Sequence, residues 1–146
     1  MFNRLHQRSR TSDGFTLIEL LIVVLILGIL AAIAVPSFLQ QRNKAQDASA
    51  KTQVRAAETA VETYATDHGG LYAGVSVSEL QSLEPTLKDS SIAKLGKAEA
   101  TEGGYVIESE ALPSTDKYKI ERTGAGEVKR TCSPKEKGAC PASGEW

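Results

Sequence analysis

Aromatic residues, histidine and cysteine are scarce in this chain of 146 residues, where Phe, Trp and Tyr together make up 5% and His and Cys number 2 each. The low aromatic content argues against a surface on which nucleobases stack. No second His or Cys lies near His68 in the sequence, so we expect no metal site there. The sequence also lacks a nucleophile elbow, paired metal ligands and a phosphate-binding loop, and it therefore predicts neither an enzyme nor a cofactor.

Neither sign of charge is in large excess, because the formal net charge is −1. The distribution is uneven. Arg4, Arg8 and Arg10 against Asp13 make the first 14 residues basic; they account for three of the 17 basic and one of the 18 acidic residues, which leaves 14 against 17. An acidic body is a poor binder of phosphate backbones, so we expect no nucleic-acid site.

A single long hydrophobic run extends from Leu17 to Leu39 and consists almost wholly of Leu, Ile, Val and Ala. About 20 residues of helix cross a hydrocarbon layer about 30 Å thick, so the run predicts a membrane helix. The basic residues before it predict that the helix begins on the cytoplasmic side and that the chain after Gln40 lies outside. The run is longer than the apolar part of a secretory signal peptide and passes directly into a helical pattern, which indicates a retained anchor.

Glu19 is the one carboxylate in this run, and Thr16-Leu17-Ile18-Glu19 has the pattern of a capping box. A carboxylate in a membrane is energetically expensive and needs a partner or a function. A new amino terminus at Phe15 is the partner that we expect. The two interpretations are compatible, because a cap in the monomer is able to give way to an intersubunit ion pair.

The segment from Gly14 to Val24, Gly-Phe-Thr-Leu-Ile-Glu-Leu-Leu-Ile-Val-Val, resembles the amino-terminal signature of type IV prepilins and of the related pseudopilins of type II secretion. The resemblance covers roughly residues 8 to 67. It implies that a prepilin peptidase cuts between Gly14 and Phe15 and methylates the new amine of Phe15. It also implies that Glu19 pairs with the Phe15 amine of a neighbouring subunit during filament assembly.

Gly28 and Pro36 are the two residues that weaken the apolar helix. Pro36 lacks a backbone donor and clashes with the carbonyl of Ala32, so we expect a bend there. Gly28 adds flexibility and allows close approach of another helix, although membrane helices tolerate both residue types. By the resemblance, both residues match the region where the helix partly unwinds in filaments.

Residues 40–66 contain no Pro or Gly and are rich in good helix formers, so the helix should continue to about Thr66 and stop near Gly69. Asp47 with Lys51 and Arg55 with Glu58 have the spacing of ion pairs on a solvent-exposed face. The opposite face should form a buried apolar stripe of Val54, Ala57, Val61 and Tyr64.

The remainder predicts a small head domain. Residues 78–83 read as a single helical turn that Ser78 caps and Pro85 ends, within a segment from 71 to 95 that otherwise reads as a loop. Three strands are predicted as an antiparallel meander, at residues 105–108, 117–122 and 127–130, with Tyr118 and Ile120 facing the helix.

Cys132 and Cys140 are predicted to lie outside the cytoplasm, where a pair of cysteines most often forms a disulfide. Closing so short a loop stabilises a fold by roughly 2–3 kcal/mol in the chain-entropy model. Zinc would need two further ligands. A disulfide-closed loop also resembles the one that many type IV pilins carry near their carboxy terminus. Glu108, Glu110 and Asp116 are better explained as solvated strand charges than as a cation site.

The sequence thus predicts an α+β fold in which a long amino-terminal helix packs on an antiparallel sheet of about three or four strands. The expected segments are a cleaved leader (1–14), a transmembrane and filament-core helix (15–39), the soluble half of that helix (40–67) and a head (68–146). The resemblance implies a pilin for adhesion, motility or DNA uptake, first a single-pass precursor in the cytoplasmic membrane and then part of an extracellular filament. The implied partners are identical subunits, the prepilin peptidase, the inner-membrane assembly machinery and, before assembly, lipid. A pseudopilin of type II secretion and a minor pilin that acts as a binding module are the alternatives.

Overall fold

The computed structural model describes residues 14–101 and 103–146, so the basic residues of the expected leader (Arg4, Arg8 and Arg10) and Asp13 lie outside the described residues. The chain divides after Ser37 into two units. In chain order, the elements are α1 (Leu17–Asp67), α2 (Val77–Leu83), the 3-10 helix η1 (Pro85–Lys88), β1 (Ala93–Thr101), β2 (Gly104–Ala111), β3 (Lys117–Arg122) and β4 (Val128–Ser133).

Helix α1 has 51 residues and continues through Pro36 without interruption. Its end is a Schellman-type turn: Gly69 has a φ of 67°, and the Gly70 N–H donates to the Ala65 carbonyl over 2.7 Å. Glycine suits this position because a side chain disfavours positive φ. The predicted stop at Gly69 is confirmed, whereas the bend at Pro36 stays a prediction.

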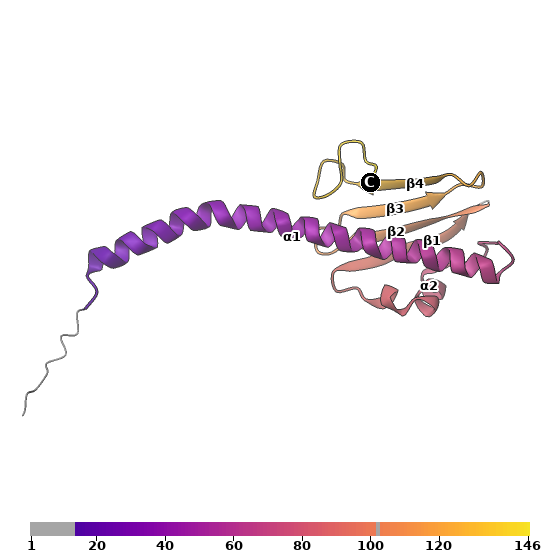
Figure 1. Cartoon of the computed structure of the whole chain (residues 1–146), viewed down its shortest axis with the longest axis horizontal. Helices are drawn as coiled ribbons and strands as arrows, with labels where there is room; N and C mark the ends of the chain where they lie inside the picture. The colour runs from indigo at the N-terminus through magenta and orange to yellow at the C-terminus, as the bar shows by residue number, and fades with distance from the viewer. Residues whose placement is uncertain (1–13, 102) are drawn as a thin grey trace, which may run out of the picture. The chain divides into compact units, whose positions relative to one another are not determined.

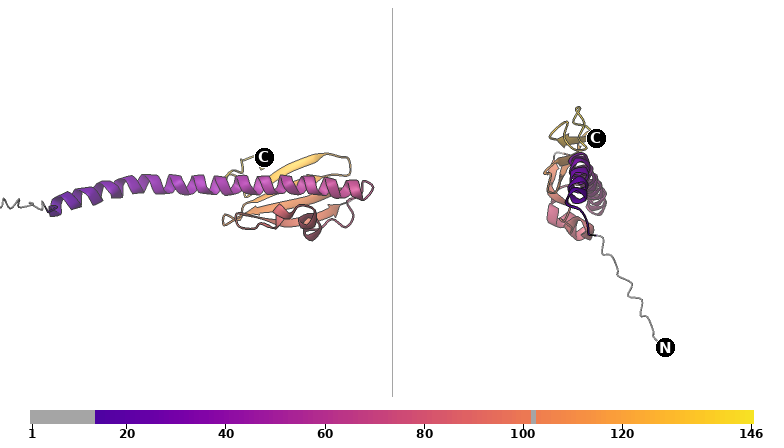
Figure 2. Two further views of the ribbon diagram at one scale, coloured as in Figure 1. Left: turned by 60° about the horizontal axis from the view of Figure 1, so that its bottom comes forward. Right: turned by 90° about the vertical axis from the view of Figure 1, so that its left-hand side faces the viewer.

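The second unit contains a four-stranded antiparallel sheet in the order β1-β2-β3-β4, and the carboxy-terminal half of α1 lies across one face of it (Figures 1 and 2). The three predicted strands are present. The prediction of loop up to residue 95 is wrong at its end, because β1 begins at Ala93 and pairs with β2 along its length. Ala, Lys, Glu and Gly dominate β1 and have weak strand propensity, so cross-strand pairing decides its structure.

The core lies between α1 and the sheet. The predicted stripe of Val54, Ala57, Val61 and Tyr64 is buried. Tyr118 and Ile120 of β3 are fully buried in the same cluster, as predicted. The small alanines on α1 allow the helix backbone to lie close to the sheet.

The short helix α2 begins earlier than expected. Ser76, not Ser78, is its N-cap, and the Ser76 hydroxyl accepts a hydrogen bond from the Glu79 N–H over 3.3 Å. Ser78 lies inside the helix, with its hydroxyl 3.0 Å from that of Ser76. The burial of Leu80 sets the position of this helix on the core. Pro85 opens η1 directly after α2.

Candidate functional site

The start of α1 is fixed by the capping box that the sequence predicts. The Glu19 N–H donates to Thr16 Oγ1 over 3.2 Å, and the Thr16 N–H donates back to Glu19 Oε2 over 3.3 Å. The Thr16 hydroxyl also donates to Glu19 Oε2 over 3.2 Å. Two otherwise unpaired amides are thereby satisfied, and the carboxylate lies in the first turn, where the helix dipole favours an anion. Glu19 is thus held beside the predicted cleavage step.

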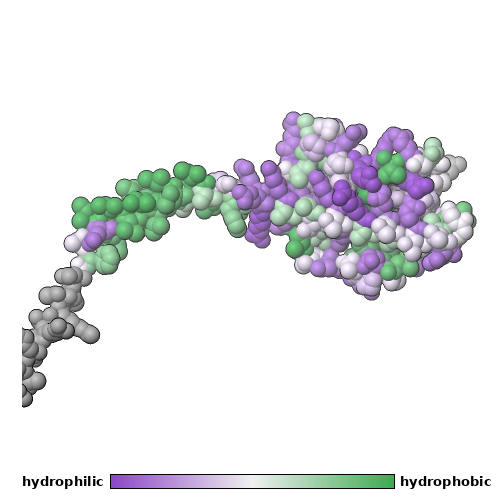
Figure 3. All heavy atoms as spheres, viewed as in Figure 1, coloured by the Kyte–Doolittle hydropathy of each residue, from purple (hydrophilic) through white to green (hydrophobic). Residues whose placement is uncertain are grey.

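Beyond this cap, α1 presents an apolar surface that nothing in its own unit covers. Phe15 is 80% exposed, and the large apolar residues that follow are exposed as far as Leu39. Figure 3 shows hydrophobic side chains along this part of α1 and a largely hydrophilic or mixed surface on the head. An 18-residue window reaches a mean hydropathy of 3.1, so by length and composition the helix is able to span a membrane. Such a surface needs lipid or another protein around it.

Gly14 and Gly28 have no structural requirement within the described chain. A Cβ built on either residue meets no heavy atom within 4 Å, and neither has a positive φ. The described residues therefore give no reason for glycine at either position.

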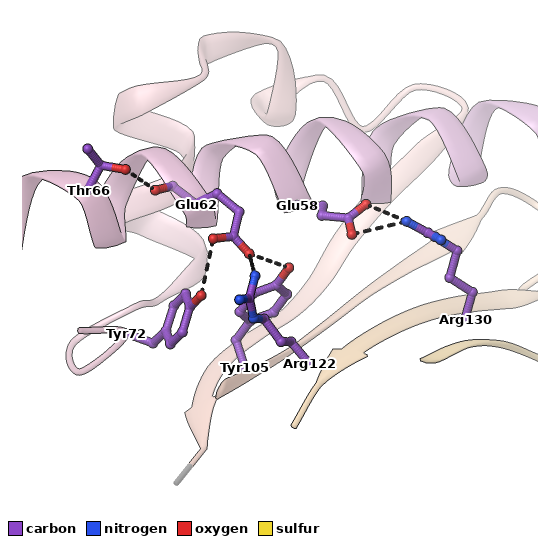
Figure 4. Close-up of polar contacts among 7 residues, drawn as sticks. All are labelled: Glu58, Glu62, Thr66, Tyr72, Tyr105, Arg122 and Arg130. Atoms are coloured by element: carbon purple, nitrogen blue, oxygen red, sulfur yellow. Dashed lines mark hydrogen bonds and ion pairs between the residues drawn. The ribbon is translucent and has the colours of Figure 1, made fainter. Parts of the chain in front are cut away.

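Glu62 on the opposite half of α1 organises a polar network that ties the helix to the sheet (Figure 4). Its Oε1 accepts from Arg122 Nη1 over 2.7 Å and from the Tyr105 hydroxyl over 3.1 Å. Its Oε2 accepts from the Tyr72 hydroxyl over 3.1 Å. Burial raises the pKa of Tyr105, and the charges of Glu62 and Glu58 raise it further. Hydrogen bonding to Glu62 and its charge raise the pKa of Arg122.

The predicted pair of Arg55 with Glu58 is wrong. Glu58 instead accepts from Arg130 Nη2 of β4 over 3.2 Å (Figure 4), and the Arg55 guanidinium lies 5.2 Å from the Trp146 ring centroid. Partners from the sheet and the carboxy-terminal segment replace the local pair because the head packs beside this part of the helix. An ion pair between residues three or four apart on a helix contributes only about 0.2–0.5 kcal/mol, so stronger tertiary contacts replace it.

The predicted pair of Asp47 with Lys51 on an exposed face is also wrong. Asp47 is fully buried and accepts from the Ala139 N–H over 2.7 Å. Lys51 donates to the Ala139 carbonyl over 3.0 Å, and its Nζ lies 5.1 Å from the Tyr118 ring centroid. A signal for this burial was present, because Asp47 precedes Ala50, Val54 and Ala57 at the same three-four spacing as the apolar stripe.

The expectation that Asp116 is a solvated strand charge is wrong. Asp116 is 1% exposed rather than solvated, and Lys137 Nζ lies 3.0 Å from its Oδ1. Glu108 is paired with Lys117 over 2.9 Å at the sheet surface, as a strand charge was expected to be. In residues 14–101 and 103–146, no group of three or more His, Cys, Asp or Glu side chains gathers where a metal ion could bind.

Cys132 and Cys140 are joined in a disulfide, which confirms the predicted pairing, with a Cα–Cα distance of 5.7 Å. The segment that follows returns to the edge of the sheet. Thr131 forms a bridge with Glu145, and the Cys132 N–H donates to the Gly144 carbonyl over 2.8 Å. This return covers part of the outer edge of β4, which limits pairing with a foreign strand.

A groove of about 410 Å³ runs between α1 and the segment that contains η1 and the start of β1. Ala48, Thr52, Leu87 and Ile92 are among its lining residues. The lining includes the carboxylate of Asp89 and several Ser and Thr hydroxyls, but no His, Cys or Lys.

Residues 9–35 match the family described as the prokaryotic N-terminal methylation motif. The chain is 47% identical over 62 residues to the type IV major pilin protein PilA of Myxococcus xanthus, which covers 42% of this chain and 27% of that protein. It is 42% identical over 62 residues to the type II secretion system core protein G of Vibrio cholerae, and the matched residues cover 42% of each chain. A fimbrial protein of Pseudomonas aeruginosa is 48% identical over 54 residues, or 37% of this chain and 35% of the relative.

The chain thus matches less than half the length of these curated relatives. No solved structure is significantly similar to it. The matched motif includes Gly14, Phe15, Glu19 and Gly28, and the structure adds a long apolar helix whose second half packs on a four-stranded antiparallel sheet. The chain therefore carries the prokaryotic N-terminal methylation motif, and over the matched residues it is similar to type IV pilins and type II secretion pseudopilins.

Proposed function

We propose that this chain is a structural subunit that polymerises through residues 15–39 into a type IV pilus. The observation that carries the proposal is the exposed apolar helix whose only carboxylate, Glu19, lies one turn from the Gly14–Phe15 step. Burial of that surface against equivalent helices would remove it from lipid. Glu19 would then be the one polar group in the interface that needs a partner.

Cleavage after Gly14 by a prepilin peptidase would create that partner. Among the residues that the structure describes, Thr16 holds the Glu19 carboxylate through neutral donors. A cleaved and methylated Phe15 would carry a charged amine, and hydrogen bonds with a charged donor are roughly twice as strong as neutral ones. The amine of a neighbouring subunit would therefore compete successfully for Glu19 and fix the register between helices.

The segment boundaries follow from this proposal. Residues 1–14 form the removed leader, 15–39 the membrane and filament-core helix, 40–67 its soluble half and 68–146 the head. The precursor would lie in the cytoplasmic membrane with its head outside, contact lipid and the inner-membrane assembly machinery, and then enter an extracellular filament of identical subunits. We assign it no catalytic activity and no cofactor.

A pseudopilin of a type II secretion system is the second candidate, because the relatives include core protein G of such systems. The disulfide-closed loop favours the pilus, since such a loop resembles that of many type IV pilins. Electron microscopy of cells with and without the chain separates the two. Loss of surface filaments supports the pilus, and loss of protein secretion with filaments unchanged supports the pseudopilus.

The assembly role predicts that Glu19→Ala leaves a processed, membrane-inserted monomer and lowers the yield of sheared filaments at least about tenfold. Removing one partner of a buried ion pair costs roughly 3–5 kcal/mol, which is ample for that loss. The measurements are the filament yield and the mass of the mature chain, which should begin at methylated Phe15.

Glu99→Ala is the matched control, because Glu99 is an exposed carboxylate on the head that pairs with the neighbouring Lys97. It should leave both the filament yield and processing unchanged. A normal filament yield from Glu19→Ala, with cleavage intact, would refute the assembly role of Glu19.

A further inference from the structure

Two carboxylates lie buried side by side where α1 meets the turn between β2 and β3. Asp47 of α1 is 0% exposed, and Asp116, directly before β3, is 1% exposed. A Cβ built on Gly138 would clash with Asp47 Oδ2 and lie 3.0 Å from Asp116 Oδ2, so both carboxylates lie beside Gly138 and close to each other. Two buried carboxylates that lie this close to each other repel when both are charged, unless neighbouring groups compensate the charges.

The compensating groups come from residues 133–139, which we call the cover. The Ala139 N–H donates to Asp47 Oδ2 over 2.7 Å, and Lys137 Nζ lies 3.0 Å from Asp116 Oδ1. Lys137 also donates to the Ser114 carbonyl over 3.3 Å, so its ammonium bridges the cover to the turn beneath. Every one of these donors lies between Cys132 and Cys140.

Other elements contribute less to the pair. Lys51 of α1 donates to the Ala139 carbonyl and not to either carboxylate. This hydrogen bond holds the cover against the helix. The Ser114 hydroxyl approaches Asp47 Oδ1 at 3.5 Å, and the Tyr118 hydroxyl of β3 faces Asp47. Removal of the cover would therefore take away the Ala139 amide and the Lys137 ammonium, and leave near the pair only the weak Ser114 contact, the Tyr118 hydroxyl and the more distant Lys51.

We infer that residues 133–139 are a charge-neutralising cover for the buried Asp47–Asp116 pair and that the Cys132–Cys140 disulfide is its latch. A dithiol opens the latch: it forms its own disulfide, gives up two electrons, and passes its two protons to the two cysteine sulfurs as their bond breaks. The released cover withdraws the Ala139 amide and the Lys137 ammonium together. The head then holds two carboxylates without their main compensating groups, so its stability becomes sensitive to both redox state and pH.

The sign of the pH effect follows from Asp47. Burial raises the pKa of Asp47 above its ordinary value of 3.8; the Asp116 charge raises it further, while the Ala139 amide, the Tyr118 hydroxyl and Lys51 lower it. The folded state therefore holds this proton more tightly than the unfolded state. The contribution of Asp47 to stability is greatest below pH 3.8 and declines as the pH rises through the raised value. Acidification should thus compensate for an open latch.

The test compares the full chain in detergent micelles with the variant Cys132→Ser/Cys140→Ser at about pH 7 and about pH 4. Denaturant unfolding is followed by Trp146 fluorescence. The double substitution should lower the unfolding midpoint more at pH 7 than at pH 4. In an Asp47→Asn/Asp116→Asn background that difference should vanish. Amide exchange near Ala139 should accelerate about tenfold or more at pH 7, since a hydrogen bond to a charged group is lost.

A disulfide that is only a cross-link gives a different result. Its removal would act on the unfolded chain and lower the unfolding midpoint equally at both pH values and in both backgrounds, and that outcome would overturn the inference. Lys137→Met provides a second test in which the disulfide stays closed. It should increase the stability gained on acidification, whereas Lys135→Met in the same loop should not. Equal pH profiles for these two lysine variants would also overturn the inference.

Discussion

Single carboxylates on α1 determine where the head is attached to the helix. Asp47 contacts the disulfide loop, Glu58 contacts β4, and Glu62 contacts β2, β3 and the turn after α1. Each therefore joins the helix to a different part of the chain. A carboxylate with several charged or hydroxyl donors is restricted in orientation, so these contacts fix the helix on the sheet more specifically than apolar packing does.

Glu62 carries the strongest prediction at this scale. Glu62→Ala should lower the free energy of unfolding by about 1–2 kcal/mol, because Arg122, Tyr105 and Tyr72 lose a shared acceptor while partial exposure screens the ion pair. Chemical unfolding in micelles, followed by Trp146 fluorescence, measures the change. Glu127→Ala, which removes the weak pair with Lys129 on the surface, should change stability by less than about 0.5 kcal/mol. Equal effects of the two substitutions would contradict the proposed importance of the network.

The short helix α2 and the strand β1 are stabilised in different ways, α2 by its N-cap and a buried side chain and β1 by pairing with β2. Helix α2 has 7 residues, too few to be stable alone, so its cap and the burial of Leu80 both matter. Strand β1 has a register shift between Leu95 and Lys97, with Gly96 between them. Such a bulge makes the sheet edge a poorer template for another strand.

The cap of α2 gives a prediction with an internal control. Ser76→Ala should destabilise the head by about 1 kcal/mol, because the Glu79 amide loses its acceptor. Ser78→Ala should be nearly neutral, since Ser78 lies within the helix and alanine is the better helix former. Hydrogen exchange of the amides of α2 reports the local effect. The opposite order would show that the helix begins at Ser78, as the sequence alone predicts.

At the scale of the whole molecule, an apolar half-helix and a polar head meet different environments. The exposed apolar surface of α1 requires lipid or other subunits, whereas the head has its own core and a polar exterior (Figure 3). Because the head buries its own apolar residues, it is able to stay folded while the environment of the apolar half changes. This division suits a subunit that passes from membrane to filament.

The response of the head to alkali tests its core. Burial raises the pKa of Tyr72, Tyr105 and Tyr118 above the ordinary value of 10.0. The folded state therefore favours the neutral phenols, whose stabilising contribution is complete below pH 10.0 and declines as the pH rises towards the raised values. The absorbance of these three tyrosinates should consequently rise only above the ordinary pKa of 10.0, and together with unfolding.

Tyr105→Phe is the informative variant for this titration, because it keeps the ring and removes the hydroxyl that donates to Glu62. It should weaken the loss of stability above pH 10.0 while lowering stability near neutral pH by about 1 kcal/mol. If all of the phenols ionise near the ordinary value before the head unfolds, the core is looser than the structure indicates.

The sequence alone predicts the features that arise from neighbouring residues. The capping box of Thr16 and Glu19, the apolar run, the buried stripe on α1 and the stop at Gly69 follow from spacings of a few residues. The backbone geometry of a helix turns such spacings directly into contacts. The disulfide was predictable for a different reason, since only two cysteines are present.

Tertiary structure alone decides the rest, because those features depend on segments that are distant in the chain. Strand β1 forms despite weak propensity because β2 offers a pairing edge. Asp47 and Glu58 leave their local partners because the disulfide loop and β4 bring donors from more than seventy residues away. A local ion pair on a solvated helix is weak, whereas a buried carboxylate must be satisfied by whichever donor the fold places beside it.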